Sequence, residues 1–403
     1  MHRLAYLSAA LLAFAVPASA ASPASPNPKD LTIPAAELSR AARLVSLLGS
    51  EDFDEREDAQ ENLAKMGRLA QPALLKGLNS DPSPEVRFRC QSLIRRASHE
   101  ELQARLATFL ADVDAKYEHD LAGWNEFKKV AGNSAASRAV FAEMLSAPKN
   151  REMVLAIAGT PAELGGLIAA RKQQFYTERF PRTPNAPRKD QSAPDLIALM
   201  FAESHVESKH VPRTVSSTTI FNQNGLKSAV DNGGDKAPVY KAIIGRWIET
   251  RDDAVSMQYA MQQATAFGLT KPGNTLAAKL VQFKGASIYY RMNAALSLAK
   301  NGAKEHLAAI ETAFNEDTNI MIRRGVVNGG IEMVTLQVRD IALAAAIMLT
   351  EQKTADYGLI EQYKQQPAMQ YTYTNWRMPE DKRKAAFEKW KAWRAKNPDF
   401  GKK

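Results

Sequence analysis

The chain has 403 residues, of which 45% are hydrophobic and 24% are charged, a composition typical of a folded protein and unlike that of a disordered one. It contains one cysteine, which excludes an intramolecular disulfide, so packing alone must hold the fold. The net charge is +9, and residues 379–403 hold nine Lys and Arg against four Asp and Glu. Electrostatic arguments about partners therefore concern this end of the chain.

The first twenty residues have the pattern of a cleavable secretory signal. His2 and Arg3 form a short basic region, an apolar run covers residues 4–16, and Ala18-Ser19-Ala20 is a small-residue cleavage site. Because this run is shorter than the about 20 residues that span a bilayer, we expect cleavage near Ala20. After cleavage, the mature protein is expected to be periplasmic or secreted and to have no transmembrane segment, and residues 21–36 are expected to form a disordered leader. The alternative is that the segment stays uncleaved as a membrane anchor.

Helix signals are clearest in residues 36–97. Ser50 is a candidate N-cap for a helix that ends at Gly67, and residues 69–79 form the next helix. Ser83 and Pro84 favour the start of a third helix. Its apolar residues recur at the helical period: Val86, Cys90, Leu93, Ile94 and Ala97. We interpret the cysteine as a buried small hydrophobe rather than a reactive thiol.

The same apolar spacing recurs at residues 102–113 and 338–349. A helix pair with one apolar stripe cannot bury that stripe alone, whereas a row of stacked pairs can. The sequence therefore predicts an all-α fold, an α-α solenoid of stacked antiparallel helix pairs with irregular central loops.

The stretch QPALLKGLNSDPSPEVRFRCQSLIRRA resembles a HEAT repeat, and LQVRDIALAAAIMLT repeats its second-helix signature. A weaker third copy lies around Arg291. The signature residues are Asp81, Val86, Arg87, Cys90, Arg291, Val338, Arg339 and Ala342. The resemblance implies that the turn aspartate and the helix arginine bond across neighbouring repeats, which makes Asp81, Arg87 and Arg339 structural. The chain also resembles exported bacterial HEAT-like proteins with no assigned activity, through residues 123–127 and 138–145, QVRDIAL and the Trp-rich end.

Two segments interrupt the helical pattern. Residues 179–194 contain four prolines and form a linker or loop between an N-terminal block at 37–178 and a second block at 195–351. Residues 318–335, around Asn328-Gly329-Gly330, can form a small β-hairpin. Helices are expected on either side of it, at 238–250, 254–267, 275–283 and 303–314 and again from Val338. A C-terminal segment at 352–403 completes the chain.

Motifs that carry chemistry are missing from the sequence. It has no phosphate-binding loop and no G-x-S-x-G elbow. His205 and His210 are five residues apart, so they do not share a helix face as zinc ligands would. Residues 231–235 begin like a calcium loop but lack its glycine and its final glutamate. We therefore predict no catalytic residue, cofactor or metal.

The C-terminal helix that begins at Pro379 allows two interpretations. It can cap the last repeat through its tryptophans, which is the interpretation we favour, or it can bind an anionic membrane or wall polymer as a basic amphipathic helix. Nucleic acid is not favoured as the ligand. The candidate surface residues are Lys382, Arg383, Lys384, Lys389, Trp390, Lys391, Trp393, Arg394 and Lys396.

These observations predict a non-catalytic, exported helical-repeat scaffold that mediates protein-protein interaction, with a partner that the sequence does not identify. The first alternative is a module that binds polyanions or the envelope surface through the basic C-terminal helix. The second is an enzyme or metal-binding protein with its site near residues 196–232.

Overall fold

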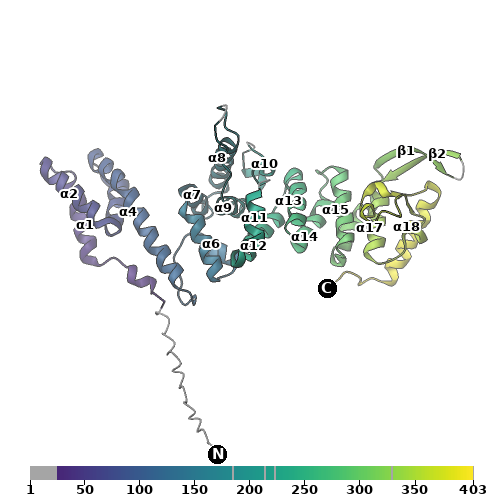
Figure 1. The fold of residues 1–403 in the computed structure, drawn as a ribbon, viewed down its shortest axis with the longest axis horizontal. Helices are drawn as coiled ribbons and strands as arrows, with labels where there is room; N and C mark the ends of the chain where they lie inside the picture. The colour runs from purple at the N-terminus through teal and green to yellow at the C-terminus, as the bar shows by residue number, and fades with distance from the viewer. Residues whose placement is uncertain (1–24, 184–185, 213–214, 222–223, 328–329, 403) are drawn as a thin grey trace, which may run out of the picture. The chain divides into compact units, whose positions relative to one another are not determined.

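The computed structural model describes residues 25–183, 186–212, 215–221, 224–327 and 330–402 (Figure 1). This part of the chain is mostly helical, as the sequence predicts, and its strands form two short antiparallel pairs. The chain divides between His119 and Asp120 into two compact units, which we describe separately. The expected signal segment lies outside the described residues.

Unit 1 consists of α1 (Ala35–Leu47), α2 (Phe53–Met66), α3 (Gln71–Ser80) and α4 (Pro84–Ala111), with short 3₁₀ turns at Pro28–Leu31 and Gly67–Ala70. Its core is formed by the apolar faces of these helices, from Ala41 and Val45 on α1 to Val86, Cys90 and Ala97 on α4. The apolar stripe expected at 86–97 and most of the one expected at 102–113 share the single helix α4, which ends at Ala111, so Val113 lies beyond the helix and is exposed.

Three local expectations for unit 1 need correction, and one is confirmed. Ser83 caps α4 by accepting a hydrogen bond from the Val86 amide. The N-cap of α2 is Asp52 and not Ser50, because its carboxylate accepts the amides of the first turn. Part of the expected disordered leader is ordered, since α1 begins at Ala35 and Arg68 binds the Leu31 carbonyl at 3.0 Å.

The third correction concerns the repeat signature. Arg87 donates to the carbonyls of Asp81 (2.6 Å) and Pro82 (2.9 Å), which belong to its own turn. The Asp81 carboxylate likewise accepts the Ser83 amide at 2.9 Å. Both residues therefore stabilise the turn that precedes α4, and neither is seen to make the ion pair between repeats that the resemblance implies.

The first part of unit 2 surrounds one helix whose central part is apolar on all sides. α9 (Ala193–Glu203) is packed by α6 (Ala135–Ser146), α7 (Pro148–Ala156), α8 (Pro161–Arg179) and α12 (Ala237–Glu249). Every residue from Leu196 to Ala202 has no exposed surface. A helix that is apolar on all sides is stable only inside a core, so α9 forms the centre of this region. Shorter helices α5 (Trp124–Ala131), α10 (Ser217–Phe221) and α11 (Asn224–Asp231) complete it.

The Pro-rich segment is a loop but not a boundary between compact units. It connects α8 to α9, and the Lys189 amide returns to bind the Glu178 carbonyl at 3.0 Å. Because α8 and α9 pack against each other, the chain on both sides of the loop belongs to unit 2. The expected division at 179–194 is therefore wrong. Proline prevents a helix there but says nothing about whether the flanking helices touch.

The second part of unit 2 is a succession of helices that pack on helices one or two places away along the chain. They are α12, α13 (Ala254–Ala266), α14 (Thr270–Gln282), α15 (Ile288–Lys300), α16 (Leu307–Glu311) and α17 (Val338–Leu349). The expected hairpin is confirmed: β1 (Asn319–Val327) pairs antiparallel with β2 (Gly330–Gln337), and Val327 lies opposite Gly330. A second pair joins β3 (Ile360–Glu361) to β4 (Trp376–Arg377).

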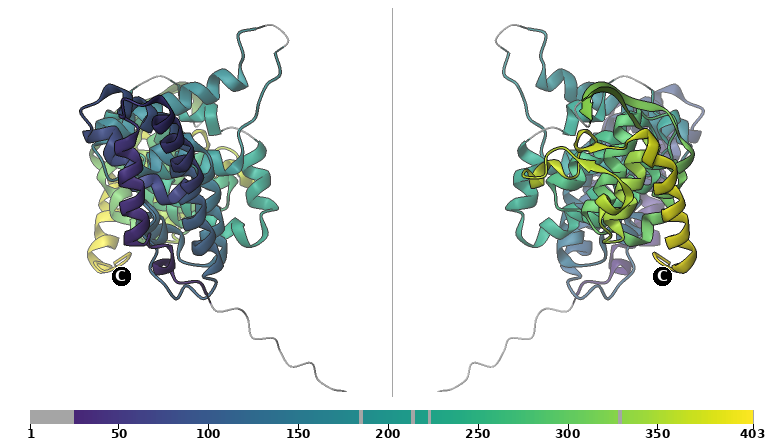
Figure 2. Two further views of the ribbon diagram at one scale, coloured as in Figure 1. Left: turned by 90° about the vertical axis from the view of Figure 1, so that its left-hand side faces the viewer. Right: turned by 90° about the vertical axis from the view of Figure 1, so that its right-hand side faces the viewer.

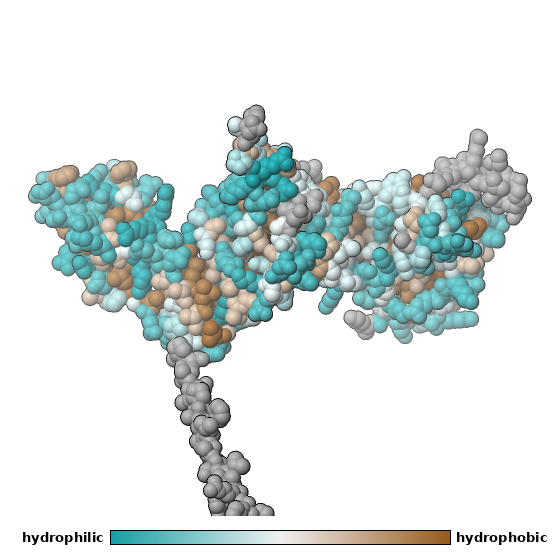
Figure 3. All heavy atoms as spheres, viewed as in Figure 1, coloured by the Kyte–Doolittle hydropathy of each residue, from teal (hydrophilic) through white to brown (hydrophobic). Residues whose placement is uncertain are grey.

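The C-terminal helix α18 (Glu380–Lys396) lies toward the viewer in the right-hand view of Figure 2, with the β1–β2 hairpin above it. On the face drawn in Figure 3, both units are mainly hydrophilic, with smaller hydrophobic areas. No helix in the described part of the chain is long and apolar enough to span a membrane.

Candidate functional site

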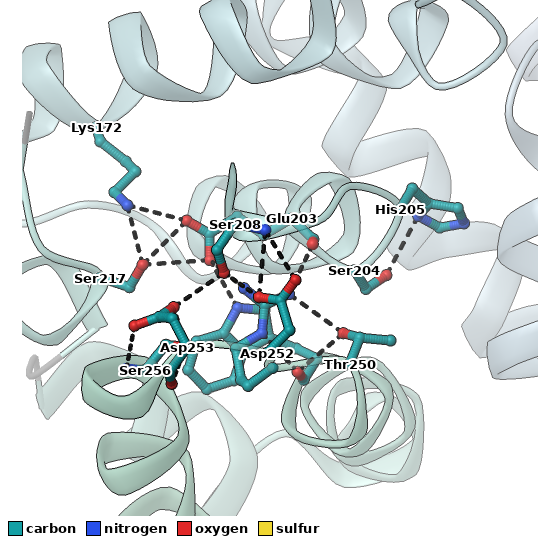
Figure 4. Close-up of polar contacts among 12 residues, drawn as sticks. Lys172, Glu203, Ser204, His205, Ser208, Ser217, Thr250, Asp252, Asp253 and Ser256 are labelled. Carbon is teal, nitrogen blue, oxygen red and sulfur yellow. Dashed lines mark hydrogen bonds and ion pairs between the residues drawn. The ribbon is translucent and has the colours of Figure 1, made fainter. Parts of the chain in front are cut away.

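A cleft of about 1210 Å³ opens in unit 2 beside the carboxyl end of α9. Its walls come from α8, α10, the segment 207–212 and the first half of α13. This volume is larger than that of a typical small-molecule pocket, so the cleft has room for several residues of a peptide. Figure 4 shows the polar residues at its base. We call it the Glu203 cleft, after the acidic residue at its floor.

Glu203 is the last residue of α9 and is 2% exposed. The indole Nε1 of Trp247 donates to its Oε2 at 2.7 Å, and the Ser217 hydroxyl donates to its Oε1 at 3.0 Å. Lys172 Nζ lies 3.2 Å from Oε1, and Arg251 Nη1 lies 3.6 Å from Oε2. One buried carboxylate therefore joins residues from α8, α9, α10 and α12.

These neighbours decide the charge of Glu203. Burial by itself raises the pKa of a carboxyl group, but the positive charges of Lys172 and Arg251, together with the donors from Trp247 and Lys172, outweigh burial. The pKa of Glu203 is consequently lowered, and the side chain is ionised at neutral pH. Both cations are therefore held by a charged partner.

Arg251 also connects the main chains of two helices. Its Nε donates to the Trp247 carbonyl at 2.9 Å, and its Nη2 donates to the Glu203 carbonyl at 2.6 Å. These carbonyls are at the carboxyl ends of α12 and α9, where helix carbonyls lack partners within the helix. The guanidinium thus satisfies helix-end acceptors and the Glu203 carboxylate together, which fixes the floor of the cleft.

Two adjacent carboxylates that follow Arg251 in the chain, Asp252 and Asp253, line one wall of the cleft. The Ser208 amide donates to both oxygens of Asp252, at 3.2 and 3.1 Å, and the Ser208 hydroxyl lies within hydrogen-bond distance of both carboxylates (Figure 4). Asp253 is also the N-cap of α13 and accepts the amides of Val255 and Ser256. Neither aspartate forms an ion pair with a residue in the described part of the chain.

Tyr259 lines the same cleft and is 5% exposed. Its hydroxyl has no hydrogen-bond partner among the residues that the structure describes, and burial raises its pKa, so it remains a protonated donor. A buried hydroxyl without a partner is costly, and such groups in native proteins often have a functional reason.

The polar groups at the floor of the cleft are bound to one another. Ser217 donates to Glu203 while accepting from Lys172 at 3.0 Å, and Lys172 also pairs with Glu203. In the described residues, no group of three or more His, Cys, Asp or Glu side chains is placed to hold a metal ion.

His205 and His210 belong to different local environments. His205 Nδ1 lies 2.7 Å from the Phe201 carbonyl, and burial lowers the pKa of the ring. It lines a separate hollow with Lys241 and Arg246 on α12. His210 belongs to the 3₁₀ turn Ser208–His210. Asp231, at the start of the calcium-like string, pairs with Lys227 on α11.

The apolar residues of the repeat signature are buried, as their spacing predicts. They are Val86, Cys90, Val338 and Ala342, each at most 2% exposed. Arg291 is also buried, and its guanidinium forms two hydrogen bonds with the Glu316 carboxylate, at 2.8 and 2.7 Å. Arg339 donates to the side chain of Gln337, two residues earlier, at 2.7 Å. None of the signature residues lines the Glu203 cleft.

The candidate surface on α18 includes residues that are not on the surface. Arg383 and Trp390 are 5% and 3% exposed. Arg383 donates to both carboxylate oxygens of the buried Asp340, at 2.9 and 3.1 Å, and Trp390 Nε1 donates to Glu311 at 3.1 Å. The expectation that these two residues belong to a ligand-binding surface is therefore wrong, because both are buried and hold α18 on α17 and α16.

The other members of the α18 set divide into two groups. Arg394 lies 3.3 Å from Glu311, Trp393 packs against Trp390, and Lys389 donates to the Asp356 carbonyl at 2.9 Å. Four lysines remain exposed and form no ion pair with a described residue: Lys382, Lys384, Lys391 and Lys396. The packing favours the capping interpretation for the tryptophan face of this helix.

Sequence reasoning placed one candidate site near residues 196–232 but identified none of the residues that form the cleft. The signal was present at Glu203, a carboxylate that ends the apolar run Leu196–Ala202. A charge at the end of a buried apolar segment needs a partner, yet Lys172 lies on α8 and Arg251 lies just after α12, so these partners give no local pattern.

Comparisons with protein-family models, curated proteins and solved structures give no match for this chain. The functional proposals below are therefore argued from the chain's own geometry.

Proposed function

We propose that this chain is an exported, non-catalytic binding scaffold of the HEAT-like solenoid class, and that it binds a segment of a partner protein in the Glu203 cleft. The proposal is supported by α12 to α17, which pack on helices one or two places away along the chain, as in the stacked helices from which solenoids build extended binding surfaces. Export is inferred from the signal-like sequence of the first twenty residues.

The observation that carries the proposal is a large cleft whose floor is fixed by a paired, buried carboxylate. Lys172, Arg251 and Trp247 all bind Glu203, so the floor is rigid before any ligand arrives. Preorganised sites lose less entropy on binding. The nearby hydroxyls of Ser208 and Ser217 already donate to carboxylates, which favours binding over catalysis.

Site-specific crosslinking in cells of the source organism tests the proposal. Val255 lines the cleft and is 63% exposed, so p-benzoylphenylalanine at this position should form a covalent adduct with one discrete protein. Leu155 on α7 is 52% exposed and lies outside the cleft, so the same substitution there is the matched control.

The adduct must also depend on the cleft itself. Thr218→Trp places an indole in the cleft and should abolish the adduct at Val255. The captured protein, identified by mass spectrometry and purified, should bind the unmodified chain and bind the Thr218→Trp variant more weakly. Equal adducts at Val255 and Leu155, or no adduct at Val255, would contradict the proposal.

A second candidate function is supported by the four exposed lysines of α18. They form no ion pair with any described residue, so they are available to an anionic surface. Cosedimentation with vesicles of equal parts phosphatidylglycerol and phosphatidylcholine tests it, because binding should fall with salt and when all four become Gln. The control removes the same charge elsewhere, by changing four other lysines to Gln: Lys65, Lys129, Lys149 and Lys271. It should reduce vesicle binding less, and equal losses of binding in the two variants would reject a specific role for α18.

A further inference from the structure

The charged residues that line the Glu203 cleft are unequally paired. Each of its three cations has a glutamate partner: Lys172 and Arg251 pair with Glu203, and Lys209 pairs with Glu207 at 2.6 Å. Lys172 and Arg251 share the single charge of Glu203, so the three cations and two glutamates together keep a net positive charge.

Its remaining acids, Asp252 and Asp253, have no such partner. Their hydrogen bonds come from the amides of Ser208, Val255 and Ser256 and from serine hydroxyls. These donors carry no full charge. Arg251 attracts both aspartates and Lys209 attracts Asp252 without forming an ion pair with them, but the acids of the lining still outnumber its cations by one, so the cleft keeps a small net negative charge. In a site partly shielded from water, such a field favours a ligand with a positive group.

We propose that the Glu203 cleft binds a basic segment of the partner protein, with a lysine or arginine side chain placed against Asp252 and Asp253. This inference rests on the proposed function and gives the chemistry of its ligand. The basic group supplies the ion pairs that the two aspartates lack, and the segment brings backbone carbonyls into the cleft.

The apolar part of the lining fits the same ligand. Val211, Pro212 and Val255 line the cleft together with the aspartates, and Val255 is largely exposed. Lysine and arginine cover apolar surface with their methylene stems while their charged ends reach a polar partner. A free ammonium or metal ion would use the carboxylates but leave this apolar surface in water.

Tyr259 gives the segment a second point of attachment. Its buried hydroxyl lacks an acceptor in the described part of the chain, and every peptide carbonyl of a bound segment is an acceptor. The cleft volume of about 1210 Å³ holds more than one side chain, so a carbonyl next to the basic residue can enter with it.

Arrays of immobilised hexapeptides with a central Arg, Lys, Ala or Glu in otherwise matched sequences test this inference on the full chain. The strongest binder is then labelled with fluorescein and titrated by fluorescence anisotropy. We expect Arg and Lys peptides to bind and Glu peptides to fail. Asp252→Asn keeps the acceptor for Ser208 but removes the charge, and should weaken binding by about tenfold or more.

Two further variants separate the site from general effects. Asp381→Asn removes one exposed carboxylate from α18, outside the cleft, and should leave affinity unchanged. Tyr259→Phe should weaken peptide binding by about fivefold without lowering the melting temperature, because the hydroxyl that it removes has no hydrogen-bond partner among the described residues. A residue that served only to pack the core would not lower affinity while preserving stability.

The outcomes are separable. Binding that does not depend on the basic residue, unchanged affinity in Asp252→Asn, or no binding to any array peptide overturns this inference. If the Val255 adduct still forms in cells under one of these outcomes, the proposed function survives and only the basic ligand is rejected. If the adduct also fails, both are rejected.

Discussion

The substitution Glu203→Gln tests the physical basis of the cleft most directly. It keeps the size and the hydrogen-bond acceptor of the side chain but removes the charge. Lys172 and Arg251, which are 7% and 5% exposed, would then lack their buried anionic partner. Removal of one member of a buried ion pair typically costs about 3–5 kcal/mol, because the remaining charge is left uncompensated in a medium of low polarity.

This loss can be measured as a shift in thermal unfolding of the full chain, followed by far-UV circular dichroism. For a unit of this size we expect the melting temperature to fall by about 6–10 °C. Glu207→Gln is the control, since Glu207 pairs with Lys209 at the solvent-exposed rim and its loss should change stability little. Adding Lys172→Met to Glu203→Gln should recover part of the stability, because it removes one of the two buried charges that have lost their partner.

The pH dependence gives an independent check. The pKa of Glu203 is lower in the folded protein than its ordinary value near 4.5. Its ionised form therefore contributes stability that is complete above that value and is lost as the pH falls through the folded-state pKa. The difference in stability between the wild type and Glu203→Gln should be constant near neutral pH and shrink in acid. A difference that matches the Glu207→Gln control, or persists unchanged in strong acid, would refute the reasoning.

Three further predictions concern single residues. Burial raises the pKa of the Cys90 thiol to about 11, so Ellman's reagent should fail to label the folded protein and should label it in urea; rapid labelling without denaturant would contradict this. Arg383→Met leaves the buried Asp340 unpaired and should cost about 3–5 kcal/mol in denaturant unfolding, whereas Lys384→Met should change little. Ser83→Ala removes the cap of α4 and should lower the stability of unit 1 by about 1 kcal/mol, and no change would mean that Pro84 suffices to start the helix.

Local sequence determined much of the secondary structure. The apolar period predicts the helix that begins at Pro84 and the one that begins at Val338, and the β-branched residues on either side of residues 328–330 predict the hairpin. These predictions succeed because a cap, a proline or a repeating apolar residue acts within about one helical turn of its own position. The prediction of Ser50 as the N-cap of α2 is wrong by two residues, because the side chains of Ser50 and Asp52 can both accept hydrogen bonds from backbone amides.

Distant packing decided what the sequence pattern could not. The Pro-rich loop does not divide the chain into compact units because α8 and α9 pack together across it. Arg383 belongs to a basic run, so the sequence predicts an exposed charge. In the structure Arg383 is buried, because it binds the carboxylate of Asp340, 43 residues earlier.

The candidate site likewise depends partly on local sequence and partly on distant packing. Glu203 could be recognised from sequence as a charge at the end of a buried helix, but its partners come from 31 residues before it and 48 residues after it. Coulomb attraction depends on distance in space, and only the folded chain brings these charges within 4 Å. The sequence alone therefore determined where helices form, whereas the tertiary structure decided which charged side chains are paired and which remain to face the cleft.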